Sequence, residues 1–328
     1  RQEEKKTKKK KVRKRKTMFG HIRSIISILL VVGIIGGSYW YYAFQYRAEV
    51  EPETNRKVTN TDSVYTMEQY LKTLKRNQTV YKYACDEAEV DNDYGTYVVP
   101  GLKSTRTLKV KGDGEAEVCT SMTPQGLAFT EDYILVSAYC KTKAHDSVIY
   151  VIDKESRRFV KEIVLNTKAH VGGMAYDTMN QILWVTGQGS TWAQANAITL
   201  SHLKNYSFDD GYHPIEFDMS YNLYKIKRAS FMTYHDGALF VGFFTQDNAS
   251  VIEKYLINAD GTLYEKEDMN LKRTVGVTEP VAYAVSMQVI SGKVQGMAFY
   301  NNKILLTRSW GILPSEVQIF NYSRYGIL

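Results

Sequence analysis

Cysteine and proline are both scarce, with three and six residues among 328. Three cysteines cannot supply a disulfide-dense scaffold, and the spacings of Cys85, Cys119 and Cys140 match no C-x-x-C metal or redox motif. The sequence therefore predicts no structural zinc site and no metal ligands. Three cysteine states stay open for an extracytoplasmic chain: a Cys119 to Cys140 disulfide, a Cys85 to Cys119 disulfide, or free thiols.

Several catalytic signatures are also missing. The sequence has no P-loop, no clear dinucleotide fingerprint and no H-E-x-x-H helix. Ser309 lies outside any G-x-S-x-G context, so no nucleophile elbow is present. The sequence therefore gives little support for an enzyme of the classes that these motifs identify.

Outside one short tail, the chain has no excess of charge of either sign. The first 16 residues hold 11 Lys or Arg and two Glu, a local charge of +9, so the remaining residues carry a net charge of −2. No basic stripe interleaved with aromatics follows, and we therefore expect no nucleic-acid binding. The tail lies just before an apolar segment, which favours contact with anionic lipid head groups.

Only one long hydrophobic run occurs, from Ser24 to Phe44, with 21 residues and no charged side chain. About 20 apolar residues of helix cross a bilayer, so the run predicts a membrane span. It is longer than a typical signal-peptide core and ends in bulky aromatics, which favours a retained signal anchor. The basic flank predicts a cytoplasmic N-terminus and an extracellular C-terminal domain in the plasma membrane, with the lipid bilayer as a partner.

The chain thus divides into a cytoplasmic basic tail (1–23), a transmembrane anchor (24–44), an extracytoplasmic spacer (45–97) and a large domain (98–328). Residues 65–74 within the spacer place several apolar side chains on one side and predict a short helix. From about residue 98, short β-branched and aromatic runs are broken by Gly, Asn, Asp and Pro, the pattern of an all-β domain.

Four segments of the large domain share one pattern, a small residue or Gln-Gly, an apolar alternation, a polar turn and a second apolar strand. They span residues 123–139, 169–188, 227–244 and 293–311. Taking Gly126, Gly173, Ser230 and Gly296 as equivalent gives repeat steps of 47, 57 and 66 residues. Such periods suit propeller blades of about 40 to 50 residues with insertions, whereas a sandwich or open meander would not repeat in this way.

Residues 147–153 (SVIYVID) and 159–165 (FVKEIVL) complete the first repeat as a four-stranded antiparallel sheet. The sequence therefore predicts an all-β fold, a β-propeller of about five blades of which four are visible. Residues 106–110, or chain beyond Leu328, are candidates for the fifth blade. The SVIYVID strand resembles those of lactonase-like and YVTN-repeat bacterial β-propeller proteins, which include both metal-dependent lactone hydrolases and binding modules.

In a propeller, the loops into the inner strands and the ends of the second strands meet at one mouth of the channel. The predicted ligand-binding residues there are Gln125, Tyr139, His170, Gln188, Ser230, Gln295, Arg308 and Trp310. These residues suit a polar ligand such as a sugar or peptide. The lactonase-like resemblance would imply carboxylates around a cation, but the equivalent inner-strand positions lack Asp and Glu.

We therefore expect a membrane-tethered binding or scaffold module for a cell-surface glycan, peptide or protein, of a kind that suits a Gram-positive bacterium. The alternative is a carbohydrate- or lactone-directed hydrolase or lyase, with His170 as the base and Arg228 and Arg308 stabilising the developing anion. No cofactor is predicted, and a channel-bound cation such as calcium stays open as part of the enzyme alternative.

Overall fold

A computed structural model describes residues 21–39, a few positions between 72 and 99, and 104–110, 114–156, 158–265, 279–311, 315–323 and 326–327. Apart from Lys72, the predicted helix at 65–74 lies outside these residues, as does most of the predicted spacer. The chain separates into two units, Arg1–Glu51 and Pro52–Leu328. In the first unit, His21–Tyr39 forms a fully exposed helix that is long and apolar enough to cross a membrane.

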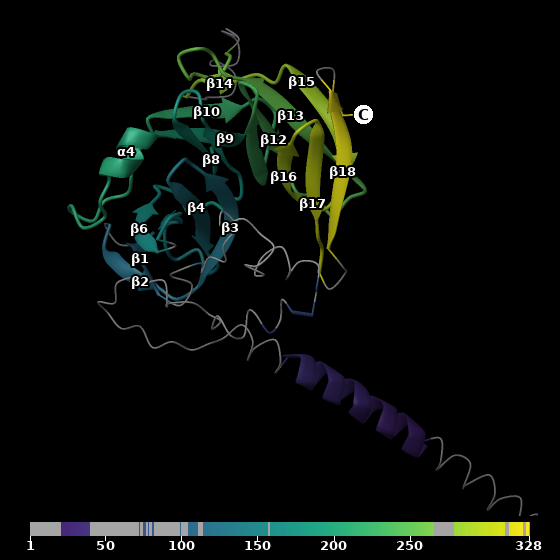
Figure 1. The fold of residues 1–328 in the computed structure, drawn as a ribbon. Helices are drawn as coiled ribbons and strands as arrows, with labels where there is room; N and C mark the ends of the chain where they lie inside the picture. The colour runs from purple at the N-terminus through teal and green to yellow at the C-terminus, as the bar shows by residue number, and fades with distance from the viewer. Residues whose placement is uncertain are drawn as a thin grey trace, which may run out of the picture. The chain divides into compact units, whose positions relative to one another are not determined.

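The second unit is a β-propeller with four blades (Figure 1). Blade I consists of β3 (Met122–Phe129), β4 (Tyr133–Cys140), β5 (Val148–Asp153) and β6 (Phe159–Val164). Blade II consists of β7 (Met174–Asp177), β8 (Ile182–Gln188), β9 (Ala193–Thr199) and β10 (Met219–Leu223), with β14 (Val281–Ala282) added parallel to β10. A short helix, α4 (Leu200–Asn205), connects β9 to β10.

Blade III consists of β11 (Phe231–His235), β12 (Ala238–Gly242), β13 (Ala249–Leu256) and β15 (Ser286–Ser291). Blade IV consists of β16 (Val294–Tyr300), β17 (Lys303–Arg308), β18 (Glu316–Ser323) and β19 (Gly326–Ile327). All four sequence repeats therefore form the first two antiparallel strands of a blade, as the pattern predicts.

Small residues allow the inner strands to approach one another closely. A Cβ on Gly126 would lie 2.9 Å from the carbonyl oxygen of Gly172, and one on Gly172 would collide with the carbonyl oxygen of Ser230. These contacts run from blade I through blade II to blade III. Backbone crowding between the inner strands thus requires glycine at positions 126 and 172.

A hydroxyl opposite the glycine recurs in three blades. The N–H of Gly126 donates to Ser137 Oγ at 2.9 Å, and the N–H of Gly173 donates to Thr186 Oγ1 at 2.9 Å. In blade IV, Gly296 pairs with Thr307 in the same register. Blade III reverses the pattern, because Phe231 of the inner strand pairs with Gly242 of the second strand.

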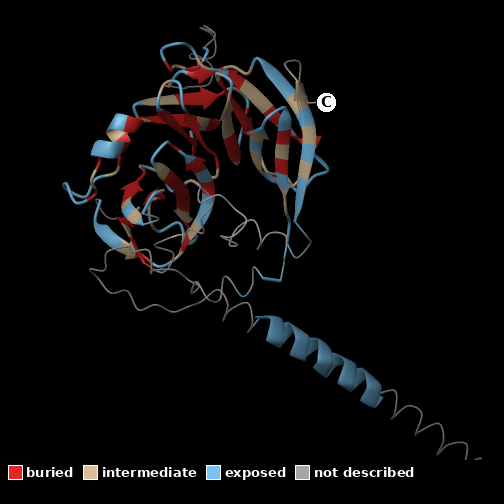
Figure 2. Ribbon diagram, in the orientation of Figure 1, coloured by how far each residue is buried: buried red, intermediate tan, exposed pale blue. Residues whose placement is uncertain are grey.

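Three apolar clusters fill the spaces between consecutive blades. The first joins blades I and II around Leu135, Tyr150 and Leu183, and the second joins blades II and III around Trp184 and Tyr255. The third joins blades III and IV. Figure 2 shows buried residues concentrated in the strands of the first three blades, whereas β18 contains none.

Residues 106–110, the candidate strand for a fifth blade, belong to a two-stranded hairpin instead. β1 (Thr105–Leu108) pairs only with β2 (Ala116–Cys119), in a two-stranded sheet beside blade I. Arg106 of β1 fixes this hairpin to β6 through an ion pair with the buried Glu162, at 3.0 Å. Two strands do not make a blade, and the described residues contain no fifth sheet of four or more strands.

Candidate functional site

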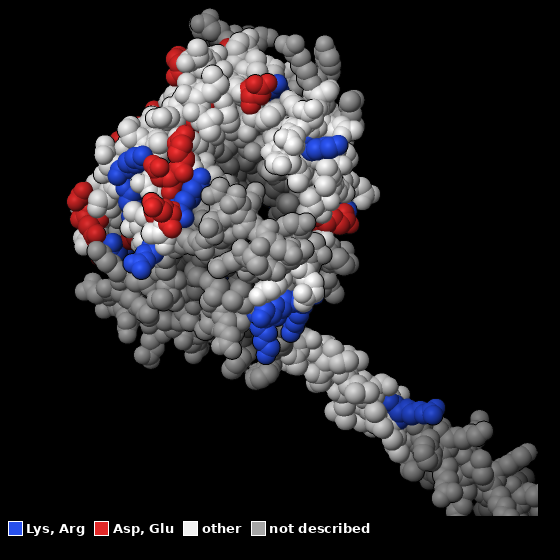
Figure 3. All heavy atoms as spheres, in the orientation of Figure 1, with Lys and Arg blue, Asp and Glu red and all other residues white. Residues whose placement is uncertain are grey.

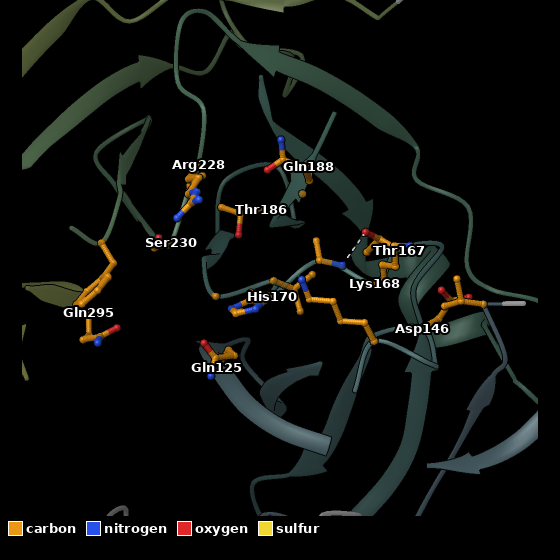
Figure 4. Close-up of a pocket in the computed structure, with 18 residues that line it drawn as sticks. Gln125, Asp146, Thr167, Lys168, His170, Thr186, Gln188, Arg228, Ser230 and Gln295 are labelled. Carbon is orange, nitrogen blue, oxygen red and sulfur yellow. Dashed lines mark hydrogen bonds between the residues drawn. The ribbon is translucent and has the colours of Figure 1, made fainter. Parts of the chain in front are cut away.

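All four blades contribute to a cavity of about 870 Å³ at one end of the inner strands. Blade I provides Gln125, blade II provides Gln188, and blade IV provides Gln295. His170 lies in the segment before β7, and Arg228 lies in the segment before β11. Figure 4 shows Gln125, His170, Arg228 and Gln295 arranged around one open space. We call this cavity the mouth pocket.

The imidazole of His170 is stacked on the ring of Tyr139, with centroids 3.9 Å apart and an interplanar angle of 19°. This stack covers one face of the imidazole and leaves the residue partly exposed to the pocket. Burial, followed by the positive charges of Lys143 and Arg228, lowers the pKa of His170. The imidazole is therefore neutral at physiological pH and presents a flat, amphipathic surface.

The charged side chains that line the mouth pocket are mostly basic. Arg228, Lys143 and Lys168 are exposed, and Asp146 is the one acidic residue among the described lining residues. Burial raises the pKa of Asp146 to about 6, which leaves a fraction of this carboxyl protonated near neutrality. Arg228 lines the pocket and is exposed, and within the described part of the chain no carboxylate forms an ion pair with its guanidinium. Basic side chains therefore outnumber acidic ones among the described lining residues.

Three glutamine amides give the mouth pocket its neutral polar groups. The amide nitrogen of Gln125 donates to the carbonyl oxygen of Pro124 at 2.9 Å, and that of Gln295 reaches the carbonyl oxygen of Ser309 at 3.4 Å. Gln188 makes a similar weak contact with Gly189 at 3.3 Å. All three residues are exposed and keep their side-chain oxygens as acceptors for a ligand.

Ser230 and Thr186 also line the mouth pocket. The hydroxyl of Thr186 is already hydrogen-bonded to the main chain. Thr186 Oγ1 accepts from the N–H of Gly173 at 2.9 Å, so this threonine fixes the wall of the pocket. Ser230 is half-buried, and its backbone N–H donates to the carbonyl oxygen of Gly242 at 2.9 Å. Its hydroxyl remains a group that a ligand can contact.

Three predicted site residues, Tyr139, Arg308 and Trp310, are not among the lining residues. Arg308 is not among the lining residues, because its guanidinium donates to the carbonyl oxygen of Gly292 at 2.8 Å and pairs with Glu316 at 3.0 Å. Trp310 packs against Phe244 with ring centroids 5.4 Å apart, and Phe244 lines the pocket. The structure thus gathers Gln125, His170, Gln188, Ser230 and Gln295 in the lining, with Tyr139 stacked on His170, and leaves Arg308 engaged within blade IV.

Among the lining residues that sequence reasoning missed are Lys143, Asp146, Lys168 and Phe244. Lys143 and Asp146 belong to the β4–β5 connection, KTKAHD, and Lys168 lies two residues before His170. Loops between the second and third strands emerge at the same end of a blade as the start of its inner strand. A systematic reading of those loops would have found Lys143 and Asp146.

The basic character of the mouth pocket is local. On the face shown in Figure 3, basic and acidic side chains are intermixed, and several lie side by side on blade I and the neighbouring α4. One such contact is the exposed pair of Lys204 with Asp132 at 3.0 Å. A ligand that prefers the mouth pocket would therefore be selected there and not by a general surface charge.

Neither a scan against protein-family models nor a search of curated proteins gave a match. Solved structures resemble this chain only with low sequence identity and low TM-scores. A hydrazine synthase from Kuenenia stuttgartiensis is 13% identical, with 62% of this chain and 52% of that chain covered and a TM-score of 0.36. The U3-55K structure is 13% identical, with 63% and 54% covered and a TM-score of 0.32.

A subtype N10 neuraminidase-like protein of A/little yellow-shouldered bat/Guatemala/060/2010 is 10% identical, with 66% of this chain and 63% of that chain covered and a TM-score of 0.32. The aligned part thus spans between about half and two thirds of the length of these chains. The assignment of a four-bladed propeller rests on the strand order and register of the chain's own sheets.

Proposed function

We propose that this protein is a membrane-tethered extracellular binding module whose mouth pocket recognises an acidic cell-surface glycan. The observation that carries the proposal is the mouth pocket itself. Three cationic side chains, three glutamine amides and a stacked imidazole converge there from four separate blades. Sugar hydroxyls match the amides, a flat sugar face matches the His170 ring, and a carboxylate or phosphate matches Arg228.

The N-terminal unit supplies the tether in this proposal. The helix His21–Tyr39 would cross the membrane, the basic tail would stay in the cytoplasm against anionic lipid, and the propeller would face outward. A surface-anchored propeller of this kind would resemble the binding members of the lactonase-like and YVTN-repeat proteins and would suit a Gram-positive bacterium.

The chemistry of the lining supports binding over metal-dependent hydrolysis. A calcium site of the lactonase kind would need several oxygen ligands around one cation, whereas three basic residues face a single carboxyl, Asp146, among the described lining residues. Arg308, offered as an anion-stabilising group for hydrolysis, is held by Glu316 and Gly292. We therefore propose that no cofactor acts at this site.

The proposal is tested by calorimetric titration of the full chain in detergent with a uronic-acid oligosaccharide, a polyol-phosphate fragment and a neutral carboxyl-reduced oligosaccharide. We expect at least one acidic ligand to bind and the neutral ligand to bind at least tenfold more weakly, because a charge-assisted hydrogen bond contributes about 1.5 to 3 kcal/mol. Equal affinity for the acidic and neutral forms, or no binding of any of them, would contradict the proposal.

Two neighbouring residues provide a matched pair of variants. Arg228 lines the mouth pocket, whereas the exposed Lys227 beside it does not. Arg228→Gln should weaken binding of the acidic ligand about tenfold or more, while Lys227→Gln removes the same charge and should leave the affinity within about twofold. A similar loss in both variants would indicate only a nonspecific charge effect.

A further inference from the structure

Two cysteines distant in sequence meet a histidine beside blade I. Cys119 ends β2, Cys140 ends β4, and His145 lies in the connection from β4 to β5. The two Sγ atoms and a ring nitrogen of His145 all lie within 4.8 Å of one another. The spacings of 21 and five residues follow no short linear motif, which is why the sequence predicts no such site.

Backbone pairing holds these three residues together. Cys140 pairs in register with Met122 at the start of β3, and the N–H of Lys141 donates to the carbonyl oxygen of Ser121 at 2.9 Å. The chain leading from Cys119 into β3 is thereby fixed beside the end of β4. His145 is placed by its bridge to Lys109, which follows β1. The cluster therefore forms as a consequence of the blade I fold.

The imidazole of His145 is oriented by a carboxylate. Nε2 of His145 lies 2.9 Å from Oε2 of Glu117, and Nδ1 lies 3.4 Å from Sγ of Cys140. If Nε2 carries the proton and donates it to Glu117, the lone pair of Nδ1 points at the sulfur atoms. Metal-ligating histidines have this arrangement, with the second ring nitrogen donating to a carboxylate.

Distances and burial fit a small soft cation. Ligands bound tetrahedrally to zinc, with bonds of about 2.3 Å to sulfur and about 2.0 Å to nitrogen, stand roughly 3.5 Å apart. The 3.4 Å between Cys140 Sγ and His145 Nδ1 matches that separation. Both cysteines are 1% exposed, whereas the side chain of Glu117 is 47% exposed, so the cluster is reached from the His145 side.

We propose that Cys119, Cys140 and His145 bind one soft divalent cation, with zinc as the natural candidate and Glu117 as the positioning residue of the histidine. Two thiolates and an imidazole form a donor set that zinc prefers, and water would complete the coordination. The cation would fasten the β1–β2 hairpin to blade I. It would also order the connection that carries Lys143 and Asp146 into the mouth pocket.

Two other roles account for less of this geometry. A cysteine nucleophile must reach its substrate, and the sulfur of Cys140 is buried beneath its neighbours. A structural disulfide between Cys119 and Cys140 would account for the two sulfurs but would give no role to the aligned His145 and Glu117 pair. Metal binding uses all four side chains.

The test uses the full chain in detergent, reduced with a phosphine, stripped with a chelator and titrated with Co²⁺ and then Zn²⁺. We expect one Co²⁺ per chain, with the thiolate-to-cobalt charge-transfer absorption and the intense visible bands of tetrahedral cobalt, all lost when Zn²⁺ displaces it. Zinc should also raise the melting temperature of the chain. A reduced chain that shows no charge-transfer absorption with Co²⁺ would overturn the proposal.

Variants distinguish the proposed metal ligands from Glu117 and from Cys85. Cys140→Ser and His145→Asn should abolish stoichiometric binding, and Glu117→Gln should weaken it about 10- to 100-fold, because a positioning residue tunes affinity without being a ligand. Cys85→Ser, which removes the third cysteine, should leave both stoichiometry and spectrum unchanged. Charge-transfer absorption that survives in Cys140→Ser and disappears in Cys85→Ser would also overturn the assignment.

Native mass spectrometry of the unmodified chain gives a readout that does not depend on variants folding. We expect a zinc adduct of one ion per chain that disappears when the thiols are alkylated. A Cys119 to Cys140 disulfide that forms from the reduced chain in air even with excess zinc present would count against the proposal, because bound thiolates are protected from oxidation. These outcomes are independent of glycan binding.

Discussion

The hydroxyl of Ser137 in β4 donates a hydrogen bond to the carbonyl oxygen of Val171, at 2.6 Å, and so connects blade I to the segment that leads into blade II. The same oxygen accepts from the N–H of Gly126 at 2.9 Å. Val171 has a φ of 45°, a left-handed conformation that a β-branched residue adopts only at a cost. One buried side chain therefore fixes two strands and a strained residue.

Ser137→Ala should lower the free energy of unfolding by about 2 kcal/mol, because it leaves a buried N–H and a buried carbonyl without their partner. Ser250→Ala is the matched control, since Ser250 is also buried and donates one hydrogen bond, to the carbonyl oxygen of Phe243 within blade III. Denaturant unfolding of both variants measures the difference. If Ser137→Ala costs no more than Ser250→Ala, the link between the blades contributes little.

The ion pair between Arg106 and Glu162 should be worth more than a surface pair. Glu162 is buried, with its side chain 5% exposed, and its burial raises the pKa of its carboxyl despite the guanidinium 3.0 Å away. Arg106→Ala would strand this carboxylate, and we expect a loss of about 3 kcal/mol at neutral pH. Lys204→Ala, which removes the exposed partner of Asp132, should have little effect on unfolding.

The loss caused by Arg106→Ala should also depend on pH. Glu162 has a folded-state pKa above its unfolded value, so its ionisation costs folding free energy as the pH rises through that folded-state pKa. Without Arg106 the raised pKa moves higher still, so more of the folded variant carries a protonated carboxyl at pH 5 than at pH 8. The variant should therefore differ less from the parent at pH 5 than at pH 8. An equal difference at both values would mean that the carboxylate is not buried.

Histidines should make the propeller less stable in mild acid. Burial lowers the pKa of His170, stacked on Tyr139, and of His235, whose ring is parallel to that of Phe299 at 4.0 Å. The unfolded chain binds these protons at higher pH, so the stability contributed by neutral histidines is complete above the unfolded value near 6.5 and falls as the pH drops below it.

Replacing both histidines with Gln should therefore reduce the loss of unfolding free energy between pH 7.5 and pH 5.5. Tyr139→Phe provides a control for the His170 part, because it keeps the stacked ring and should preserve the pH dependence. Tyr139→Ala exposes the stacked face of the His170 imidazole to water and should weaken the pH dependence. Urea unfolding at the two pH values measures each slope. An unchanged slope in the double variant would assign the acid sensitivity to other groups.

Much of the fold was predictable because the determining signals are local. The alternation of apolar residues predicts the paired strands of all four blades, a glycine recurs at the inner strand of three of them, and crowding at Gly126 and Gly172 gives a physical reason for the glycine. The two-strand pairing of residues 105–108 was not predictable, because it depends on β2 and on Glu162, which is 56 residues from Arg106.

Part of the candidate site was likewise predictable from local sequence, and part was not. Gln125, Gln188 and Gln295 occupy fixed places in the repeat and were expected to gather. Lys143 and Asp146 come from the β4–β5 connection, which is not part of the repeat pattern. Arg308 occupies a repeat position, but its guanidinium forms an ion pair with Glu316. The cluster of Cys119 with His145 depends on strand pairing between β2, β3 and β4, so linear spacing carries no signal for it.

The basic tail should fix the orientation of the helix His21–Tyr39. Eleven Lys or Arg residues among the first 16 oppose transfer of the N-terminus across a membrane, so an epitope placed after Leu328 should be accessible to antibody on intact cells. Replacing the basic residues at positions 5–16 with Gln should leave the helix inserted but hide the epitope in a measurable fraction of molecules. Replacing Lys227 and Arg228 in the propeller is the matched control, because charges so far from the span do not set topology. An epitope that stays fully accessible after neutralisation of the tail would show that the apolar segment and its aromatic flank determine orientation without the positive charges.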